Sequence, residues 1–288
     1  MTASAFAPGK LILMGEHAVV YGHPALAIAI DRGMTVELQH RPGPSGLDTP
    51  WVNDERLQKA LEEILPTDGV GVRITSTLPV GRGMGSSAAL AVALVRAAAK
   101  LEGREASIEE TNDGAFRVEK VFHGKPSGID HTVSMRGGAL WYQRTDNGPQ
   151  FESVSIAPLP LVVIDSGSAG NTAKMVEGVK NRRPVVDQHL EAMSALLTAT
   201  LPSLIAGDHK QTGLAWLENH RLLKEIGVST PTLDSIVSLA IDNGAWGAKL
   251  AGAGGGGVVI ALTADPEHLI ATATANGLQA FQTQIKTW

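Results

Sequence analysis

A glycine-rich stretch at residues 78–89 constrains the fold of this chain more than any other segment. It reads Leu-Pro-Val-Gly-Arg-Gly-Met-Gly-Ser-Ser-Ala-Ala, with alternate glycines at Gly81, Gly83 and Gly85, which we call the glycine loop. Alternating apolar residues predict a strand at residues 70–77, before the loop. The alanine-rich run that continues to Leu101 predicts a helix after it. The expected order is therefore strand, glycine loop, helix.

The glycine loop has the properties of an anion site. Glycine tolerates positive φ and lets a ligand approach the main chain closely. The first N–H groups of a helix have no internal partner and lie at the positive end of its dipole, which attracts phosphate. Ser86 and Ser87 follow the loop, where a hydroxyl can cap the helix or contact a metal bound to the phosphate. The plainer alternative is a glycine-rich turn before a capped helix, with no ligand.

Two familiar phosphate motifs do not match the glycine loop. A Walker A loop ends in Gly-Lys-Ser or Gly-Lys-Thr, and no lysine precedes Ser86 here. A dinucleotide fingerprint needs an acidic residue at the end of a second strand, about 20 residues further on. Glu102 has roughly that spacing, but it lies beside Gly103 at the end of the predicted helix. Neither motif explains the stretch.

Composition narrows the class of protein. The chain has 288 residues, enough for one large or two ordinary domains, and 43% of them are hydrophobic, enough for a sizeable core. A net charge of −5 argues against binding nucleic acid through backbone electrostatics. The absence of cysteine excludes disulfides and zinc–thiolate sites and is compatible with a reducing compartment.

The N-terminal residues and the longest apolar run indicate where in the cell we expect the protein. Residues 1–7 lack a basic region and a long apolar core, so we expect no secretory signal. The longest apolar run, residues 88–95, is too short to span a bilayer. We therefore expect a cytoplasmic protein without a membrane partner.

The rest of the chain mixes strand and helix patterns. Strands are expected at both sides of a turn near residue 16 and at residues 35–39, 139–143, 161–164, 258–262 and 279–286. Helices are expected at residues 53–65, 107–119, 171–180, 185–205, 209–226, 230–243 and 266–276. Ser107 and Glu110 predict a capping box, and residues 146–150 predict a hairpin loop. We place a domain boundary before the strand at 161–164, which gives domains of residues 1–157 and 158–288.

Polar residues gather at two other places. The first apolar segments are flanked by three ionisable residues, Lys10, Glu16 and His17. The alternative without a site is that Lys10 is a solvated lysine and His17 a turn histidine. Asp130 ends a polar turn and is the only acidic residue between Glu119 and Asp146, so a site built there would use it. An aspartate that caps a helix is the alternative.

A second glycine-rich stretch lies near the C-terminus. Lys249 precedes the run Leu-Ala-Gly-Ala-Gly-Gly-Gly-Gly, whose residues 252–257 we call the C-terminal glycine segment. Four consecutive glycines inside a folded domain indicate close backbone packing or a loop against a ligand.

Three glycine-bearing segments in this order resemble the motifs of the GHMP kinase superfamily over nearly the whole chain. They are Pro-Gly-Lys with Gly-Glu-His at residues 8–17, the stretch at residues 78–89, and the run at residues 249–257. Residues 15–22, and residues 121–130 followed by 137–140, resemble the mevalonate kinases within this superfamily. The sequence departs from the usual pattern at Ala251, where Thr is common, and at Met14; Arg82 and Met84 occupy variable positions.

The resemblance implies an α+β fold of two domains. The N-terminal domain would be ribosomal-protein-S5-like and the C-terminal domain ferredoxin-like, with ATP and substrate in the cleft between them. The implied activity is ATP-dependent phosphorylation of the 5-hydroxyl of (R)-mevalonate to 5-phosphomevalonate, a step in isoprenoid biosynthesis.

The resemblance also implies roles for particular residues. Asp130 would accept the hydroxyl proton and Lys10 would pair with it. Mg²⁺ would be held by Ser87 and Glu119, and mevalonate by Glu16, His17 and Arg144. The ATP phosphates would bind along Gly81, Arg82, Gly83, Met84, Gly85, Ser86 and Ser87.

Two alternatives remain at this stage. One is another GHMP kinase, such as a phosphomevalonate kinase or a mevalonate 3-kinase. The other is a non-catalytic binder of small molecules on the same fold. The expected partners are ATP and mevalonate, with no nucleic acid and with a homodimer left open.

Overall fold

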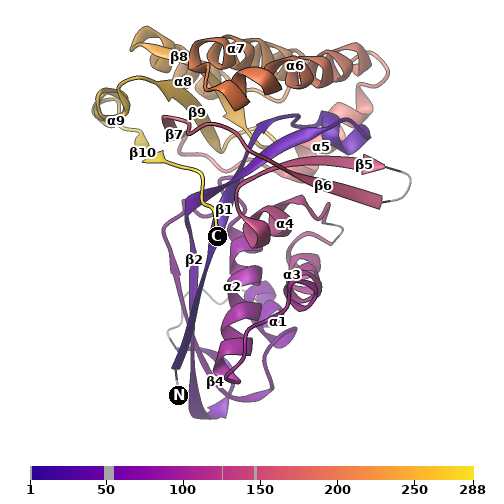
Figure 1. Ribbon diagram of the computed structural model, residues 1–288, viewed down its shortest axis with the longest axis vertical. Helices are drawn as coiled ribbons and strands as arrows, with labels where there is room; N and C mark the ends of the chain where they lie inside the picture. The colour runs from indigo at the N-terminus through magenta and orange to yellow at the C-terminus, as the bar shows by residue number, and fades with distance from the viewer. Residues whose placement is uncertain (1, 49–54, 125, 146–147) are drawn as a thin grey trace.

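Among the described residues, two β-sheets organise an elongated molecule: one lies in the first half, residues 2–154, and the other in the second half, residues 161–283 (Figure 1). The computed structural model describes residues 2–48, 55–124, 126–145 and 148–288. The first two residues of the helix expected at 53–65 and of the loop expected at 146–150 lie outside the described residues.

The first sheet is built around one long strand. It contains β1 (Thr2–Met14), β2 (Ala25–Pro44), β3 (Gly46–Leu47), β4 (Asp68–Ser76), β5 (Ala139–Thr145) and β6 (Gly148–Val154). The order is β3-β4-β2-β5-β6, and β1 also pairs with β2. β2 pairs with β5 through its first residues and with β4 through its later ones. The strand expected at 35–39 is therefore the continuation of the one that begins at Ala25.

The first part of β2 is buried on both faces. Its large side chains, such as Leu26 and Ile28, share a core cluster with Val163 of the second sheet. The alanines between them pack in another cluster with Val133 of a helix on the opposite face. Small and large residues alternate because one face receives a helix and the other receives a sheet.

The described residues of the first half contain four α-helices: α1 (Glu55–Glu62), α2 (Ser86–Leu101), α3 (Ile108–His123) and α4 (Ile129–Arg136). A short 3₁₀ helix, η1, spans Ala18–Tyr21. α2 is buried without interruption from Ala88 to Val95, as its apolar residues on every side predict. It packs against β1, β2, α3 and α4, so its N-terminus is held firmly in place.

The second sheet has the ferredoxin-like arrangement. Its strands are β7 (Leu161–Asp165), β8 (Ala245–Ala251), β9 (Val258–Thr263) and β10 (Gln279–Thr283), in the antiparallel order β10-β7-β9-β8. Helices α5 (Thr172–Asn181), α6 (Asp187–Ala206), α7 (His209–Glu225) and α8 (Pro231–Asp242) connect β7 to β8, and α9 (Pro266–Ala275) connects β9 to β10. This order of elements and strands confirms the expected α+β fold.

Five elements were missing from the sequence interpretation: η1, β3, α4, β6 and β8. Residues 148–150 belong to β6, so the expected hairpin loop is shorter than predicted. Ser107 caps α3 as expected, since its Oγ accepts a hydrogen bond from the amide of Glu110 at 3.1 Å. The Glu110 carboxylate, however, binds Arg104.

The last residues of the chain return to the first half. Ile285 forms a β-bridge with Ile30, and the amide of Lys286 donates to the carbonyl of Ala29 at 2.9 Å. Trp288 lies against the guanidinium of Arg96, with 4.6 Å between ring centre and carbon. The C-terminus therefore lies near the middle of the molecule in Figure 1. None of the described helices is both long and apolar enough to cross a membrane.

Candidate active site

The glycine loop leaves its backbone open at two positions. Gly81 and Gly83 have φ of +76° and +79°, and a β-carbon at either would meet no atom within 4 Å. Gly85, with φ of +71°, immediately precedes Ser86 at the start of α2. Met84 is only 1% exposed and anchors the loop in the core. The loop combines a fixed base with free backbone at the N-terminus of a buried helix, as an anion site requires.

Lys10 lies directly beneath this loop. Its backbone amide donates to the carbonyl of Met84 at 2.9 Å, next to an irregularity in the pairing of β1 with β2. A β-carbon at Gly85 would lie 2.8 Å from Cγ of Lys10, so glycine is needed for this approach. The Lys10 side chain is 6% exposed and its Nζ lies 3.3 Å from Oδ1 of Asp130. The structure thus brings together the two residues expected to be catalytic.

Helix α4 places Asp130 against Lys10. The hydroxyl of Ser134, one turn after Asp130, donates to the carbonyl of Pro8 at 2.7 Å and fixes α4 to β1. Asp130 lies in the first turn of α4, and its side chain is 33% exposed. It is therefore the more accessible member of a half-buried pair.

Ser87 and Glu119 also lie together. Ser87 Oγ is 3.4 Å from Oε1 of Glu119, a carboxylate that is 2% exposed. Two hard oxygen donors so close together fit Mg²⁺, which takes few protein ligands when phosphate and water supply the others. In the part of the chain that the structure describes, no group of three or more His, Asp or Glu side chains could hold a metal.

Two histidines, which the sequence interpretation did not single out, contact this pair. His123 Nε2 lies 2.9 Å from Oγ of Ser87, and His131 Nδ1 lies 3.1 Å from Oε2 of Glu119. His123 follows Glu119 by one helical turn, and that spacing was visible in the sequence. His131 follows Asp130 directly, but only the helix α4 shows that it turns toward Glu119.

Glu16 is engaged inside the protein. It is 1% exposed, forms an ion pair with Lys249, and accepts a hydrogen bond from Asn219 at 3.3 Å. Complete burial lowers the pKa of Lys249, and the charge of Glu16 opposes that change. Lys249 had no predicted role. Its position just before the C-terminal glycine segment was the only feature of the sequence that could have marked it as a functional residue.

His17 is held in a conformation that is uncommon for a residue with a side chain. Its φ is +60°, and its Nε2 lies 2.8 Å from the carbonyl oxygen of Ala253 in the C-terminal glycine segment. Burial lowers the pKa of His17, which favours the neutral ring. Its Nδ1 is buried and has no hydrogen-bond partner among the described residues.

Arg144 is separate from these residues. It lies on β5 and is exposed. It is near Tyr142, where burial raises the pKa of the phenol and the charge of Arg144 opposes the rise. The Tyr142 hydroxyl donates to the carbonyl of Ser127 at 3.4 Å, close to Asp130 in sequence. Among the described contacts, none joins Arg144 to Lys10 or Asp130.

The two glycine-rich regions meet across the halves. A β-carbon at Gly252 would lie 3.7 Å from the carbonyl oxygen of Gly83, and one at Gly257 would lie 2.9 Å from that of Arg82. The Arg82 guanidinium itself binds Asp165 at the end of β7. The glycine loop is therefore supported by the second half of the molecule.

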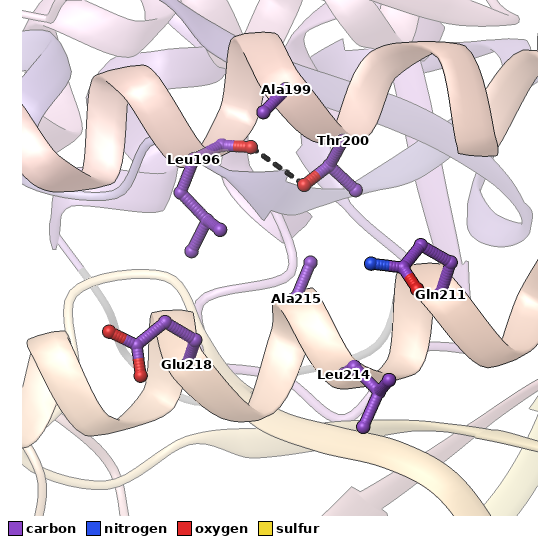
Figure 2. Close-up of a pocket in the computed structure, with 7 residues that line it drawn as sticks. All are labelled: Leu196, Ala199, Thr200, Gln211, Leu214, Ala215 and Glu218. Atoms are coloured by element: carbon purple, nitrogen blue, oxygen red, sulfur yellow. Dashed lines mark hydrogen bonds between the residues drawn. The ribbon is translucent and has the colours of Figure 1, made fainter.

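A groove between α6 and α7 lies outside this arrangement (Figure 2). Its volume is about 240 Å³, and none of its lining residues was predicted to belong to the site. The Thr200 hydroxyl in its wall donates to the carbonyl of Leu196 at 2.6 Å. The lining residues are Leu196, Ala199, Thr200, Gln211, Leu214, Ala215 and Glu218. This mostly apolar set offers no cation for a phosphate.

Comparison with known proteins identifies the family. Residues 55–138 match the model of the GHMP kinases N terminal domain, and residues 200–277 match that of the GHMP kinases C terminal. The chain belongs to the GHMP kinase family, as its motifs predicted.

Its relatives point to one branch of the family. It is 36% identical to the mevalonate kinase of Thermococcus sibiricus over 95% of this chain and 92% of that protein. The mevalonate kinase of Methanothermobacter thermautotrophicus is 34% identical, over 91% and 90%. The structure of L. major mevalonate kinase in complex with R-mevalonate superposes with a TM-score of 0.87 at 29% identity, covering 100% of this chain and 97% of that one.

Proposed function

We propose that this chain transfers the γ-phosphoryl group of ATP to the 5-hydroxyl of (R)-mevalonate and releases ADP and 5-phosphomevalonate. The substrate is supported by mevalonate kinases that match the chain over at least nine-tenths of its length. The chemistry is carried by one observation, the Lys10–Asp130 pair below an open glycine loop.

Asp130 is the proposed general base. Its carboxylate is partly exposed, so a substrate hydroxyl can reach it and give up a proton to it. The Lys10 ammonium is a compact charge with three donors, 3.3 Å from that carboxylate. It orients Asp130 and stabilises negative charge that develops on the reacting oxygens.

The glycine loop is the proposed phosphate site. Backbone groups from Gly81 to Ser86 would bind the ATP phosphates, with the dipole of α2 favouring their negative charge. Ser87 and Glu119 would hold Mg²⁺, which neutralises phosphate charge when it is bound. Exchange of either oxygen ligand should change the Mg²⁺ requirement. Titrating activity against Mg²⁺ in Ser87→Ala and Glu119→Gln tests this, and unaltered metal dependence in both variants would refute the assignment.

His17, Glu16 and Arg144 are the proposed mevalonate residues, and their contacts suggest different contributions. The buried Nδ1 of His17 lacks a hydrogen-bond partner among the residues that the structure describes, which suits a hydrogen bond to substrate. Glu16 is bound to Lys249 and Asn219, which suits holding the His17 turn in place. Arg144 is an exposed cation of the type that binds a carboxylate, although it lies apart from the catalytic pair.

A substrate panel tests the proposed reaction. The purified chain is incubated with ATP, Mg²⁺ and either mevalonate or phosphomevalonate, and ADP release is measured. Of the two candidate substrates, we expect only mevalonate to be phosphorylated. Phosphorus NMR of the product should place the phosphate on the 5-oxygen. Turnover with phosphomevalonate, or a 3-phosphate product, would assign the chain to another kinase of the family. ATP binding without turnover would indicate a non-catalytic binder.

Two further predictions accompany this proposal: a domain boundary between residues 157 and 158, and a cytoplasmic location; a homodimer stays open. Light scattering of the purified chain measures its mass in solution. Limited proteolysis locates the boundary, and fractionation of cells locates the protein.

A further inference from the structure

Arg82 belongs to the glycine loop, but its side chain binds the other half of the molecule. Its Nε lies 2.9 Å from Oδ1 and 3.0 Å from Oδ2 of Asp165, and its Nη2 donates to the carbonyl of Gly167 at 3.1 Å. Three contacts use two separate nitrogens of a rigid planar group. The orientation of the Arg82 side chain is therefore fixed.

Asp165 is well placed to act as an anchor. It is the last residue of β7, and its side chain is 7% exposed. Its Oδ1 also accepts the amide of Gly167 at 2.9 Å, so one carboxylate fixes both the segment after β7 and the guanidinium. Charge-assisted hydrogen bonds of this type are stronger than those between neutral groups.

The backbone around Arg82 is equally constrained. A β-carbon at Gly257 would come within 2.9 Å of the Arg82 carbonyl oxygen, so the two chains are in close contact. The Gly257 carbonyl in turn accepts the amide of Ser166, next to Asp165, at 3.0 Å. The glycine loop, the C-terminal glycine segment and the end of β7 thus meet at one point.

We propose that Arg82 is a positioning residue for the nucleotide. The Arg82–Asp165 ion pair holds the glycine loop against the second half of the molecule, so the phosphate-binding backbone is formed before the nucleotide arrives. Arg82 acts through the backbone on either side of it and keeps its contact with Asp165 when nucleotide binds. This inference rests on the proposed function, because it requires that the glycine loop binds the phosphates of ATP.

The opposite role for Arg82 is a direct contact with phosphate after release from Asp165. The two roles predict opposite effects at Asp165. If the pair positions the loop, loss of either partner weakens nucleotide binding. If Arg82 leaves Asp165 to bind phosphate, loss of the Asp165 charge frees the guanidinium and strengthens binding.

Calorimetric titration of ADP with Mg²⁺ distinguishes the two roles without requiring turnover. We expect Arg82→Ala and Asp165→Asn each to raise the dissociation constant of ADP about tenfold, which is within the usual range for coupled neighbours. The double variant should be no weaker than the worse single variant, because both changes break one interaction. Arg221→Ala, which removes two exposed ion pairs on α7, is the matched control and should leave ADP binding unchanged.

Arg82→Lys keeps the positive charge but loses the planar guanidinium with its several donors. We therefore expect a dissociation constant of ADP between that of the unaltered chain and that of Arg82→Ala. Melting temperatures show whether each variant folds. If Arg82→Ala does not fold, ADP binding by the two single variants Arg82→Lys and Asp165→Asn distinguishes the two roles. Unchanged or tighter ADP binding in Asp165→Asn would overturn the positioning role alone. Failure of the unaltered chain to bind ADP would overturn the proposed function as well.

Discussion

Each of the two glycine-rich regions contains a glycine of nearly the same positive φ, but for a different physical reason. Gly83 in the glycine loop has φ of +79° and Gly254 in the C-terminal glycine segment has φ of +78°. A β-carbon at Gly83 would meet nothing within 4 Å, whereas one at Gly254 would lie 2.1 Å from the carbonyl oxygen of Val228. Glycine leaves room for a ligand in the first region and for the protein's own backbone in the second.

The charged residues beside the two regions differ in the same way. Near the glycine loop, Asp130 keeps a third of its side chain exposed and faces Lys10. Near the C-terminal glycine segment, Lys249 and Glu16 are 0% and 1% exposed and bind each other. We infer that the first region carries out the chemistry and the second holds it in shape. The predictions below test this division.

Asp130→Asn should give the largest effect. The change preserves size and removes the base, and loss of a positioned base costs on the order of 10²–10⁴-fold in kcat. ADP binding and the melting temperature should remain close to those of the unaltered chain, because Asp130 is partly exposed. Steady-state kinetics together with thermal melting measure both. A variant with nearly full turnover would remove Asp130 from the mechanism.

Lys249→Met should act on stability. Removing one partner of a buried ion pair leaves an unpaired charge, which costs about 3–5 kcal/mol of unfolding free energy. Adding Glu16→Gln should recover part of that loss, because the remaining charge is then removed too. Urea unfolding of the single and double variants measures the free energies. If Lys249→Met lowers kcat without lowering stability, the second region also takes part in the chemistry.

Gly254→Ala and Gly83→Ala compare the two glycine regions directly. We expect Gly254→Ala to cost about 3 kcal/mol, since a methyl group must displace backbone at a positive φ. Gly83→Ala should cost only about 1–2 kcal/mol, for the φ strain alone. Its further effect should be weaker ADP binding. Equal losses of unfolding free energy in the two variants would contradict the distinction.

His17→Ala should have the smallest of these effects and a selective one. It removes a buried nitrogen that has no hydrogen-bond partner in the described part of the chain, so we expect the KM for mevalonate to rise several-fold and the KM for ATP to change little. Both KM values and the melting temperature are measured on one preparation. An earlier melting transition with an unchanged mevalonate KM would make His17 a structural turn residue instead.

Local patterns were enough to predict most of the fold. The predicted helices at residues 171–180, 185–205 and 209–226 correspond to α5, α6 and α7 within two residues at each end. Each has a repeating apolar face or a clear capping residue, such as Asp208 before α7. These signals depend only on neighbouring residues.

The missed elements lack such signals. α4 reads Ile-Asp-His-Thr-Val-Ser-Met-Arg and has no apolar stripe, because six of its eight residues are buried by neighbouring elements on several sides. β8 reads Ala-Trp-Gly-Ala-Lys-Leu-Ala and contains a buried lysine and an internal glycine. Gly247 is required there because α7 approaches closely. A β-carbon at Gly247 would lie 2.0 Å from the carbonyl oxygen of Gly213 on α7.

The sequence by itself determined the strand–loop–helix around Gly81, Gly83 and Gly85 and the family, and it predicted a catalytic role for Asp130. These follow from residue types at short spacing, where the backbone conformation is a local property. Only the tertiary structure decided which side chains meet. Glu16 and Lys249 are 233 residues apart in sequence, yet they form one buried pair. Arg82 points toward Asp165 because the two halves pack so closely that its guanidinium reaches the end of β7. Such partnerships depend on the burial that packing imposes, and no local pattern in the sequence records it.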